Sequence, residues 1–250
     1  MINEITKEWD FDAQQAKNII INNIKLWFKN NAPSGNAVIG ISGGKDSTIV
    51  AALCVEALGK DRVIGVLMPN GVQKDIKDSI AICDYLGIKN FCINIEDSYY
   101  AIIKRMKDNE INVSNQTIYN LPPRLRMSTL FAIAQSCNGY VMNTSNLSEY
   151  FLGWFTFGSD TCGSFAPIMD YTCNEVIAIG KTLNIPDKLV FKTPSDGLMG
   201  ITDEEKFGFS YADCDRYIRK KDHNVSPDVI EKIEKMHKKS EYKRRPISAS

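Results

Sequence analysis

The stretch from Ala37 to Ser47 is the sequence feature that most constrains how this chain can fold. It runs from an apolar segment of strand type into Ser-Gly-Gly-Lys-Asp-Ser, and apolar residues with helical spacing follow at once. A strand that turns sharply into a helix presents free backbone N–H groups, and the helix dipole favours negative charge at that end. Because glycine lacks a Cβ, the backbone there can approach a phosphate closely. The stretch therefore predicts a strand–turn–helix unit that holds phosphate groups.

The carboxylate of Asp46 indicates that the phosphate site also binds a metal ion. A carboxylate beside bound phosphates requires a bridging cation, and Mg²⁺ usually takes one or two carboxylates together with substrate phosphates. The spacing G-x-x-x-x-G-K-[ST], typical of P-loop kinases and GTPases, is absent from the sequence. The alternative interpretation is a Gly-rich turn in which Ser and Asp only cap the helix.

Apolar periodicity along the rest of the chain predicts strands that alternate with helices. The predicted strands lie at 37–41, 62–68, 91–95 and 140–143. The predicted helices lie at 16–28, 49–58, 75–86, 97–107, 124–137 and 172–183 and from 226 onward, with loops at 108–119 and 191–209. This alternation favours an α/β fold, a doubly wound parallel sheet with helices on both faces, whose ligands bind at the carboxyl ends of the strands. We expect a single domain over residues 1–250.

Charge and composition exclude several classes of function. The 30 basic and 30 acidic side chains give a net charge of zero, so no overall field recruits nucleic acid or an anionic membrane. No apolar run approaches the ~20 residues that span a bilayer, and no signal peptide is recognisable. The seven cysteines include no C-x-x-C pair, and only two histidines are present, which argues against a zinc site. We expect a cytoplasmic protein that binds neither nucleic acid nor membrane.

Five segments, taken in order, resemble one family. Ser42–Ser47 resembles the S-G-G-x-D-S signature of the N-type ATP pyrophosphatases, the PP-loop superfamily. It is followed by Leu121–Met127, Val141–Thr156, Pro194–Leu198 and Thr202–Tyr211. Together these segments resemble the ammonia-dependent NAD synthetases over nearly the whole chain. The resemblance implies an adenine nucleotide alpha hydrolase-like fold, a homodimer, and ATP-dependent amidation of deamido-NAD by ammonia through an adenylated intermediate, with release of AMP and pyrophosphate.

The resemblance also implies roles for individual residues. ATP would be bound by the loop after the first strand and by three further positions: Gly40, Ile41, Ser42, Gly43, Gly44, Lys45, Asp46, Ser47, Met68, Thr144 and Ser195. Mg²⁺ would be held by Asp46 and Glu149. Deamido-NAD would be bound by Arg124, Phe157, Ser164, Tyr242 and Lys243. Asp160 would place or deprotonate the ammonium, and with Asp46 it forms the expected catalytic pair. The loop at 191–209 is expected to close over ATP and exclude water from the adenylate.

Three of the positions expected to bind deamido-NAD depart from the family pattern. Phe157 stands where Lys or Arg is usual, Ser164 where a second Asp is common, and Tyr242 where a His is found. Three explanations stay open: the loop shifts by one residue, Lys243 or Arg244 compensates, or the acceptor is not deamido-NAD. The alternatives to the synthetase are a PP-loop adenylating enzyme for another carboxylate and an ATP-binding protein that has lost synthetase activity.

Overall fold

The fold is built on a four-stranded sheet with the strand order β3–β2–β1–β4, in which every neighbouring pair is parallel. The computed structural model describes residues 5–73, 76–190 and 202–245. The strands are β1 (Asn36–Gly40), β2 (Val63–Leu67), β3 (Lys89–Cys92) and β4 (Gly139–Val141). All four predicted strands are present, although β3 lies two or three residues earlier than predicted and β4 is shorter.

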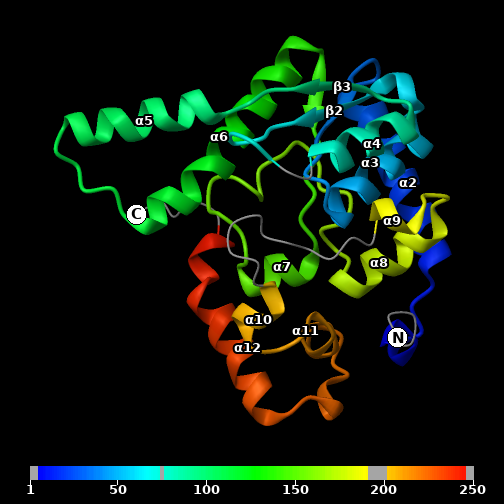
Figure 1. Cartoon of the computed structure of the whole chain (residues 1–250). Helices are drawn as coiled ribbons and strands as arrows, with labels where there is room; N and C mark the ends of the chain where they lie inside the picture. The colour runs from blue at the N-terminus through cyan, green and yellow to red at the C-terminus, as the bar shows by residue number, and fades with distance from the viewer. Residues whose placement is uncertain (1–4, 74–75, 191–201, 246–250) are drawn as a thin grey trace.

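Alternating side chains of β1 point into two different cores, because successive residues of a strand face opposite sides of the sheet. Ala37 and Ile39 pack into the larger core with helices α2 (Ala13–Asn31), α3 (Lys45–Leu58), α4 (Ile76–Leu86) and α8 (Cys173–Thr182). Val38 packs into a smaller core with α6 (Asn115–Ser136) on the other face. Figure 1 shows these helices on both sides of the sheet. The predicted doubly wound α/β class is therefore confirmed.

The strand order indicates where on the sheet a ligand would bind. From β1 the chain moves outward through β2 to β3 and then returns to add β4 on the opposite side of β1. In such sheets the crevice for ligands opens where the order reverses, outside the carboxyl ends of the strands. Here that point lies between β1 and β4, so the segments that follow these two strands are brought together.

The loop predicted at 108–119 is partly wrong, because α6 begins at Asn115. Ser114 caps this helix by accepting a hydrogen bond from the Thr117 N–H at 3.1 Å. The helix then continues through Pro122 and Pro123, which sequence reasoning treats as helix breakers. The Asn-rich first turns carry little apolar periodicity, so only the capping residue could have signalled the start.

A third group of apolar side chains joins helices of the C-terminal part of the chain. Leu152, Phe207, Phe209, Cys214 and Ile233 form this cluster. They come from or adjoin α7 (Leu147–Leu152), α10 (Asp203–Phe207), α11 (Tyr211–Ile218) and α12 (Pro227–Lys239), which lie together below the sheet in Figure 1. The predicted irregular stretch at 191–209 is thus wrong at its end, where Thr202 caps α10. Residues 191–201 lie outside the described residues.

The remaining elements are α5 and several short helices. They are η1 (Thr6–Trp9), η2 (Lys60–Arg62), α5 (Glu96–Asp108), α9 (Asp187–Val190), η3 (Asp222–Asn224) and η4 (Glu241–Lys243). In the described parts of the chain, every helix is too short or too polar to cross a bilayer.

Candidate active site

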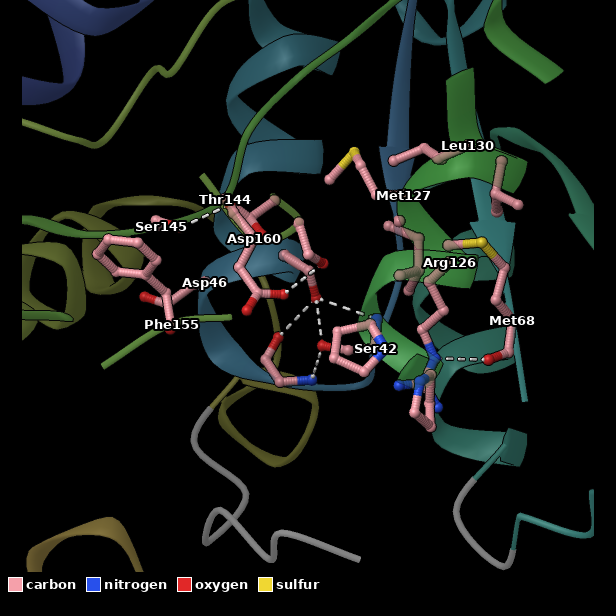
Figure 2. A pocket seen from close by; sticks show the side chains of 18 of the residues that line it. Ser42, Asp46, Met68, Arg126, Met127, Leu130, Thr144, Ser145, Phe155 and Asp160 are labelled. Atoms are coloured by element: carbon pink, nitrogen blue, oxygen red, sulfur yellow. Dashed lines mark hydrogen bonds between the residues drawn. The ribbon is translucent and has the colours of Figure 1, made fainter. Parts of the chain in front are cut away.

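One cavity of about 1220 Å³ lies at the predicted edge of the sheet. Its wall is formed by the loop after β1, the segment after β2, the side of α6, the segment after β4 and the loop around Phe155 to Asp160. Figure 2 shows Asp46 and Asp160 on one side of this cavity and Arg126 with Met68 on the other. The segments that follow β1, β2 and β4 therefore meet in one cavity at the carboxyl ends of the strands, where the predicted fold binds its ligands.

The loop at Ser42–Ser47 has the geometry expected of a phosphate cradle. Ser42 Oγ accepts a hydrogen bond from the Gly44 N–H at 3.2 Å, and Ser47 Oγ donates to the Gly44 carbonyl at 3.1 Å. Gly43 has a backbone φ of +81°, which residues with a Cβ rarely adopt. The helix α3 begins directly after Gly44, so the free N–H groups of its first turn face the cavity edge. These features favour an anion at this point.

Two half-buried carboxylates, those of Asp46 and Glu149, and the ammonium of Lys45 lie at the cradle. Lys45 Nζ lies 2.7 Å from Asp46 Oδ2, and the Asn146 side-chain amide donates to Asp46 Oδ1 at 3.4 Å. Burial, followed by the nearby Asp46 carboxylate, raises the pKa of Glu149 to about 8. Burial alone would lower the pKa of Lys45, but the Asp46 carboxylate reverses this and raises it.

The donor set fits a hard divalent cation. Asp46 and Glu149 together carry two carboxylates, and the ammonium of Lys45 lies against Asp46. Oxygen ligands of this kind suit Mg²⁺, which leaves its remaining coordination positions to water and substrate phosphates. The predicted metal-binding pair is thus placed together.

The far wall of the cavity is lined by Arg126, which sequence reasoning missed. Its Nε donates to the Met68 carbonyl at 2.9 Å. Burial lowers the pKa of Arg126, an effect that the Asp160 carboxylate opposes. Among the residues that the structure describes, Arg126 is the one Lys or Arg that lines the cavity. Its neighbour Arg124 turns away, because residues two positions apart on a helix face different directions.

Asp160 is held rigidly at the cavity wall. Its Oδ2 accepts a hydrogen bond from the Thr156 N–H at 2.7 Å, and its Oδ1 accepts one from Ser159 Oγ at 3.2 Å. The backbone carbonyl of Asp160 accepts a further bond from Ser145 Oγ at 2.9 Å. Thr144 lines the same cavity, whereas Ser195 lies outside the described residues.

The residues predicted to bind deamido-NAD lie in the described part of the chain but do not line this cavity. Arg124 Nε donates to the Phe157 carbonyl at 3.1 Å, and the Phe157 ring is half exposed, 6.2 Å from that of Tyr242. The Lys243 ammonium donates to the carbonyls of Gly153 and Phe155 at 2.8 and 2.7 Å. These residues therefore form a group of their own beside the Phe155–Asp160 loop. Ser164 is exposed at the end of β4, where its N–H donates to the Val141 carbonyl.

The two cations that could replace the missing Lys or Arg are already bonded to the backbone. Burial lowers the pKa of Lys243, whose ammonium makes the two bonds described above. Arg244 donates to the Phe151 carbonyl at 3.0 Å and to Ser240 Oγ at 2.6 Å. In this conformation both side chains stabilise the segment from Phe151 to Phe155.

Comparison with known proteins identifies the family of the chain. Residues 15–247 match the family model for NAD synthase. The chain is 36% identical over 239 residues to an NH(3)-dependent NAD(+) synthetase from Pyrococcus horikoshii, covering 90% of this chain and 92% of the relative. An NMN synthetase structure from Francisella tularensis has a TM-score of 0.87 at 29% identity and covers 96% of this chain and 99% of that one. An NH3-dependent NAD synthetase structure from Campylobacter jejuni has a TM-score of 0.79 at 27% identity, with the same coverage. On its loop, its fold and these matches, the chain belongs to the NAD synthase family.

Proposed function

We propose that the protein is a ligase that converts deamido-NAD and ammonia to NAD at the expense of ATP. The main support for this proposal is that the phosphate cradle, the carboxylates of Asp46 and Glu149, and Asp160 all line one cavity. A nicotinate carboxylate is a poor acyl donor to ammonia. Attack of a carboxylate oxygen on the α-phosphate releases pyrophosphate and gives an acyl adenylate. Ammonia then attacks the acyl carbon, AMP leaves with that oxygen, and one proton is lost.

The residues of this chain serve these steps mainly by binding and orientation. The cradle from Gly40 to Ser47 binds the phosphates through N–H groups and the dipole of α3. Asp46 and Glu149 would hold Mg²⁺, which when bound neutralises negative charge on the triphosphate. Asp160, fixed by Thr156 and Ser159, presents a carboxylate that can hold an ammonium and accept its proton. Thr144 and Ser195 remain proposed ATP contacts.

A second candidate acceptor is the mononucleotide, nicotinate mononucleotide, whose amide is NMN. Two observations favour it: the structural similarity to a protein named NMN synthetase, and the absence of the usual cation at Phe157. The cations near that position, Arg124 and Lys243, are bonded to backbone carbonyls in this conformation. A mononucleotide lacks the second phosphate and the adenosine of deamido-NAD, so it offers fewer groups for such cations to bind.

One experiment separates these candidates. Pyrophosphate release is measured with MgATP and ammonium, with either acceptor or with none, and the amidated product is followed by chromatography. Formation of NAD in step with pyrophosphate supports the NAD synthetase, and a higher kcat/KM for the mononucleotide supports the second candidate. Pyrophosphate release that depends on neither acceptor would indicate another carboxylate. ATP binding without release under all conditions would support a protein that has lost synthetase activity.

The homodimer, the cytoplasmic location and the single-domain organisation also remain proposals. Exposed apolar side chains on α5 and on the start of α6, including Tyr100, Ile118 and Tyr119, support a second copy as partner. Figure 1 shows these helices projecting from the rest of the molecule. Analytical ultracentrifugation at several protein concentrations tests this, and a monomer at all concentrations would refute it.

A further inference from the structure

A buried carboxylate outside the cavity joins three helices next to the proposed metal ligands. Asp215 lies on α11 with no exposed surface. Its Oδ1 accepts a hydrogen bond from Ser148 Oγ at 2.5 Å. Its Oδ2 accepts two bonds from Asn174, from the backbone N–H at 2.8 Å and from the side-chain amide at 2.7 Å. One carboxylate thus joins the first turns of α7 and α8 to α11.

The hydroxyl of Ser148 completes this connection. While donating to Asp215, Ser148 Oγ accepts the Cys173 N–H at 2.9 Å. Its one donor is therefore used, and its one observed acceptor bond points to the first residue of α8. Ser148 is itself fully buried, so these bonds are shielded from water and are costly to lose.

The next residue on α7 is Glu149. The helix α7 has six residues, too few for it to be stable by itself, so its position depends on what its first turn is bonded to. Within that turn Asn146 Oδ1 accepts the Glu149 N–H at 3.0 Å, and Glu149 Oε2 accepts the Asn146 N–H at 3.2 Å. The side-chain amide of Asn146 also donates to Asp46 Oδ1 at 3.4 Å. The same turn therefore sets the place of Glu149 relative to Asp46.

We infer that Asp215, acting through Ser148, is a positioning residue for the metal-binding pair Asp46 and Glu149. The inference rests on the proposed function, because it requires Mg²⁺ to bind with ATP at that pair. Loss of a partner that orients a metal ligand typically lowers metal affinity about 10- to 100-fold. Disruption of the Asp215–Ser148 bond should therefore weaken the contribution of Mg²⁺ to nucleotide binding and leave metal-free nucleotide binding unchanged.

Glu175 provides a matched control. It is as deeply buried as Asp215, lies on α8, and bonds Arg219 at the end of α11 with distances of 2.8 and 2.6 Å. Within the described part of the chain, its other hydrogen bonds go to η1 and to the N-cap of α8 rather than to α7. Glu175→Gln should therefore destabilise the same pair of helices without moving Glu149.

The experiment measures binding of a non-hydrolysable ATP analogue by calorimetry, in MgCl₂ and in EDTA, together with thermal unfolding. For Ser148→Ala we expect a roughly tenfold loss of affinity in Mg²⁺ and none in EDTA. For Glu175→Gln we expect a lower Tm with the wild-type ratio of the two affinities. Asp215→Asn keeps the shape of the group and should fall between wild type and Ser148→Ala.

Two results would overturn the inference, and they differ in meaning. A folded Ser148→Ala protein with the wild-type Mg²⁺ effect would refute the positioning role alone. A wild-type protein whose analogue binding is the same in MgCl₂ and in EDTA would refute the proposed metal pair and the positioning role with it.

Discussion

Substitution of Gly43 by Ala is a direct test of the phosphate cradle. Gly43 has φ +81°, and a Cβ placed there would lie 3.0 Å from Ser79 Oγ on α4. The left-handed conformation costs an alanine ~1–2 kcal/mol, and crowding in a packed interior adds ~1 kcal/mol or more. We therefore expect Gly43→Ala to lower the free energy of unfolding by ~3 kcal/mol, which for a chain of this size is a fall in Tm of about 6–12 °C.

A control and a double variant separate the two contributions. Gly59, with φ +83°, has no atom within 4 Å of the position that a Cβ would take, so Gly59→Ala should show the conformational cost alone. The double variant Gly43→Ala/Ser79→Ala should recover the part of the unfolding free energy that Gly43→Ala loses through crowding against Ser79 Oγ. The assay is chemical denaturation with ATP-analogue affinity measured on each variant. If Gly43→Ala is as stable as wild type, or if Ser79→Ala restores no more stability in the Gly43→Ala protein than it adds to wild type, the argument from this geometry is wrong.

Further predictions concern stability, pH and binding. Ser79→Ala alone should stabilise the protein by ~1 kcal/mol, because the buried hydroxyl has no hydrogen bond in the described structure; a loss of stability on denaturation would contradict this. Glu175→Gln should lower the free energy of unfolding by ~2 kcal/mol, since it removes the charge of a buried carboxylate that is hydrogen-bonded to Arg219, whose side chain is 30% exposed; unchanged stability would contradict it. The Arg216 hydrogen bond lowers the pKa of Glu8 below its usual 4.5, so this pair stabilises the fold above that pH and the effect is lost as pH falls through the lowered pKa. The Tm of Glu8→Gln should therefore fall less steeply with acid than that of wild type, and parallel curves would refute the assignment. Arg126→Gln should raise the KM for ATP or the acceptor about tenfold, and unchanged steady-state kinetics would exclude a role in binding.

The fold was largely predictable because its signals are local. The strand–turn–helix at Ala37–Ser47 and the period of the flanking helices follow from neighbouring residues, and the parallel order follows from their alternation. The start of α6 was missed because Asn115 to Tyr119 lack apolar periodicity and two prolines follow.

The residues of the candidate site were predictable where they lie in the loop sequence. They were less predictable where the site depends on which way a helix turns its side chains. The family resemblance implies that Asp46 and Glu149 act together, and both line the same cavity. It led to Arg124 and not to Arg126, which lines the cavity, because which arginine faces it depends on how α6 is rotated against the sheet. Nor could it reveal Asp215, which meets Ser148 only through the packing of three helices.

The most direct test of the account follows one oxygen atom. Deamido-NAD labelled with heavy oxygen in its nicotinate carboxylate is incubated with enzyme, MgATP and ammonium, and the products are analysed by mass spectrometry. Adenylation of the carboxylate predicts one labelled oxygen in AMP for each NAD formed and none in pyrophosphate. Unlabelled AMP alongside NAD, or label in pyrophosphate or inorganic phosphate, would contradict attack at the α-phosphate held by the cradle.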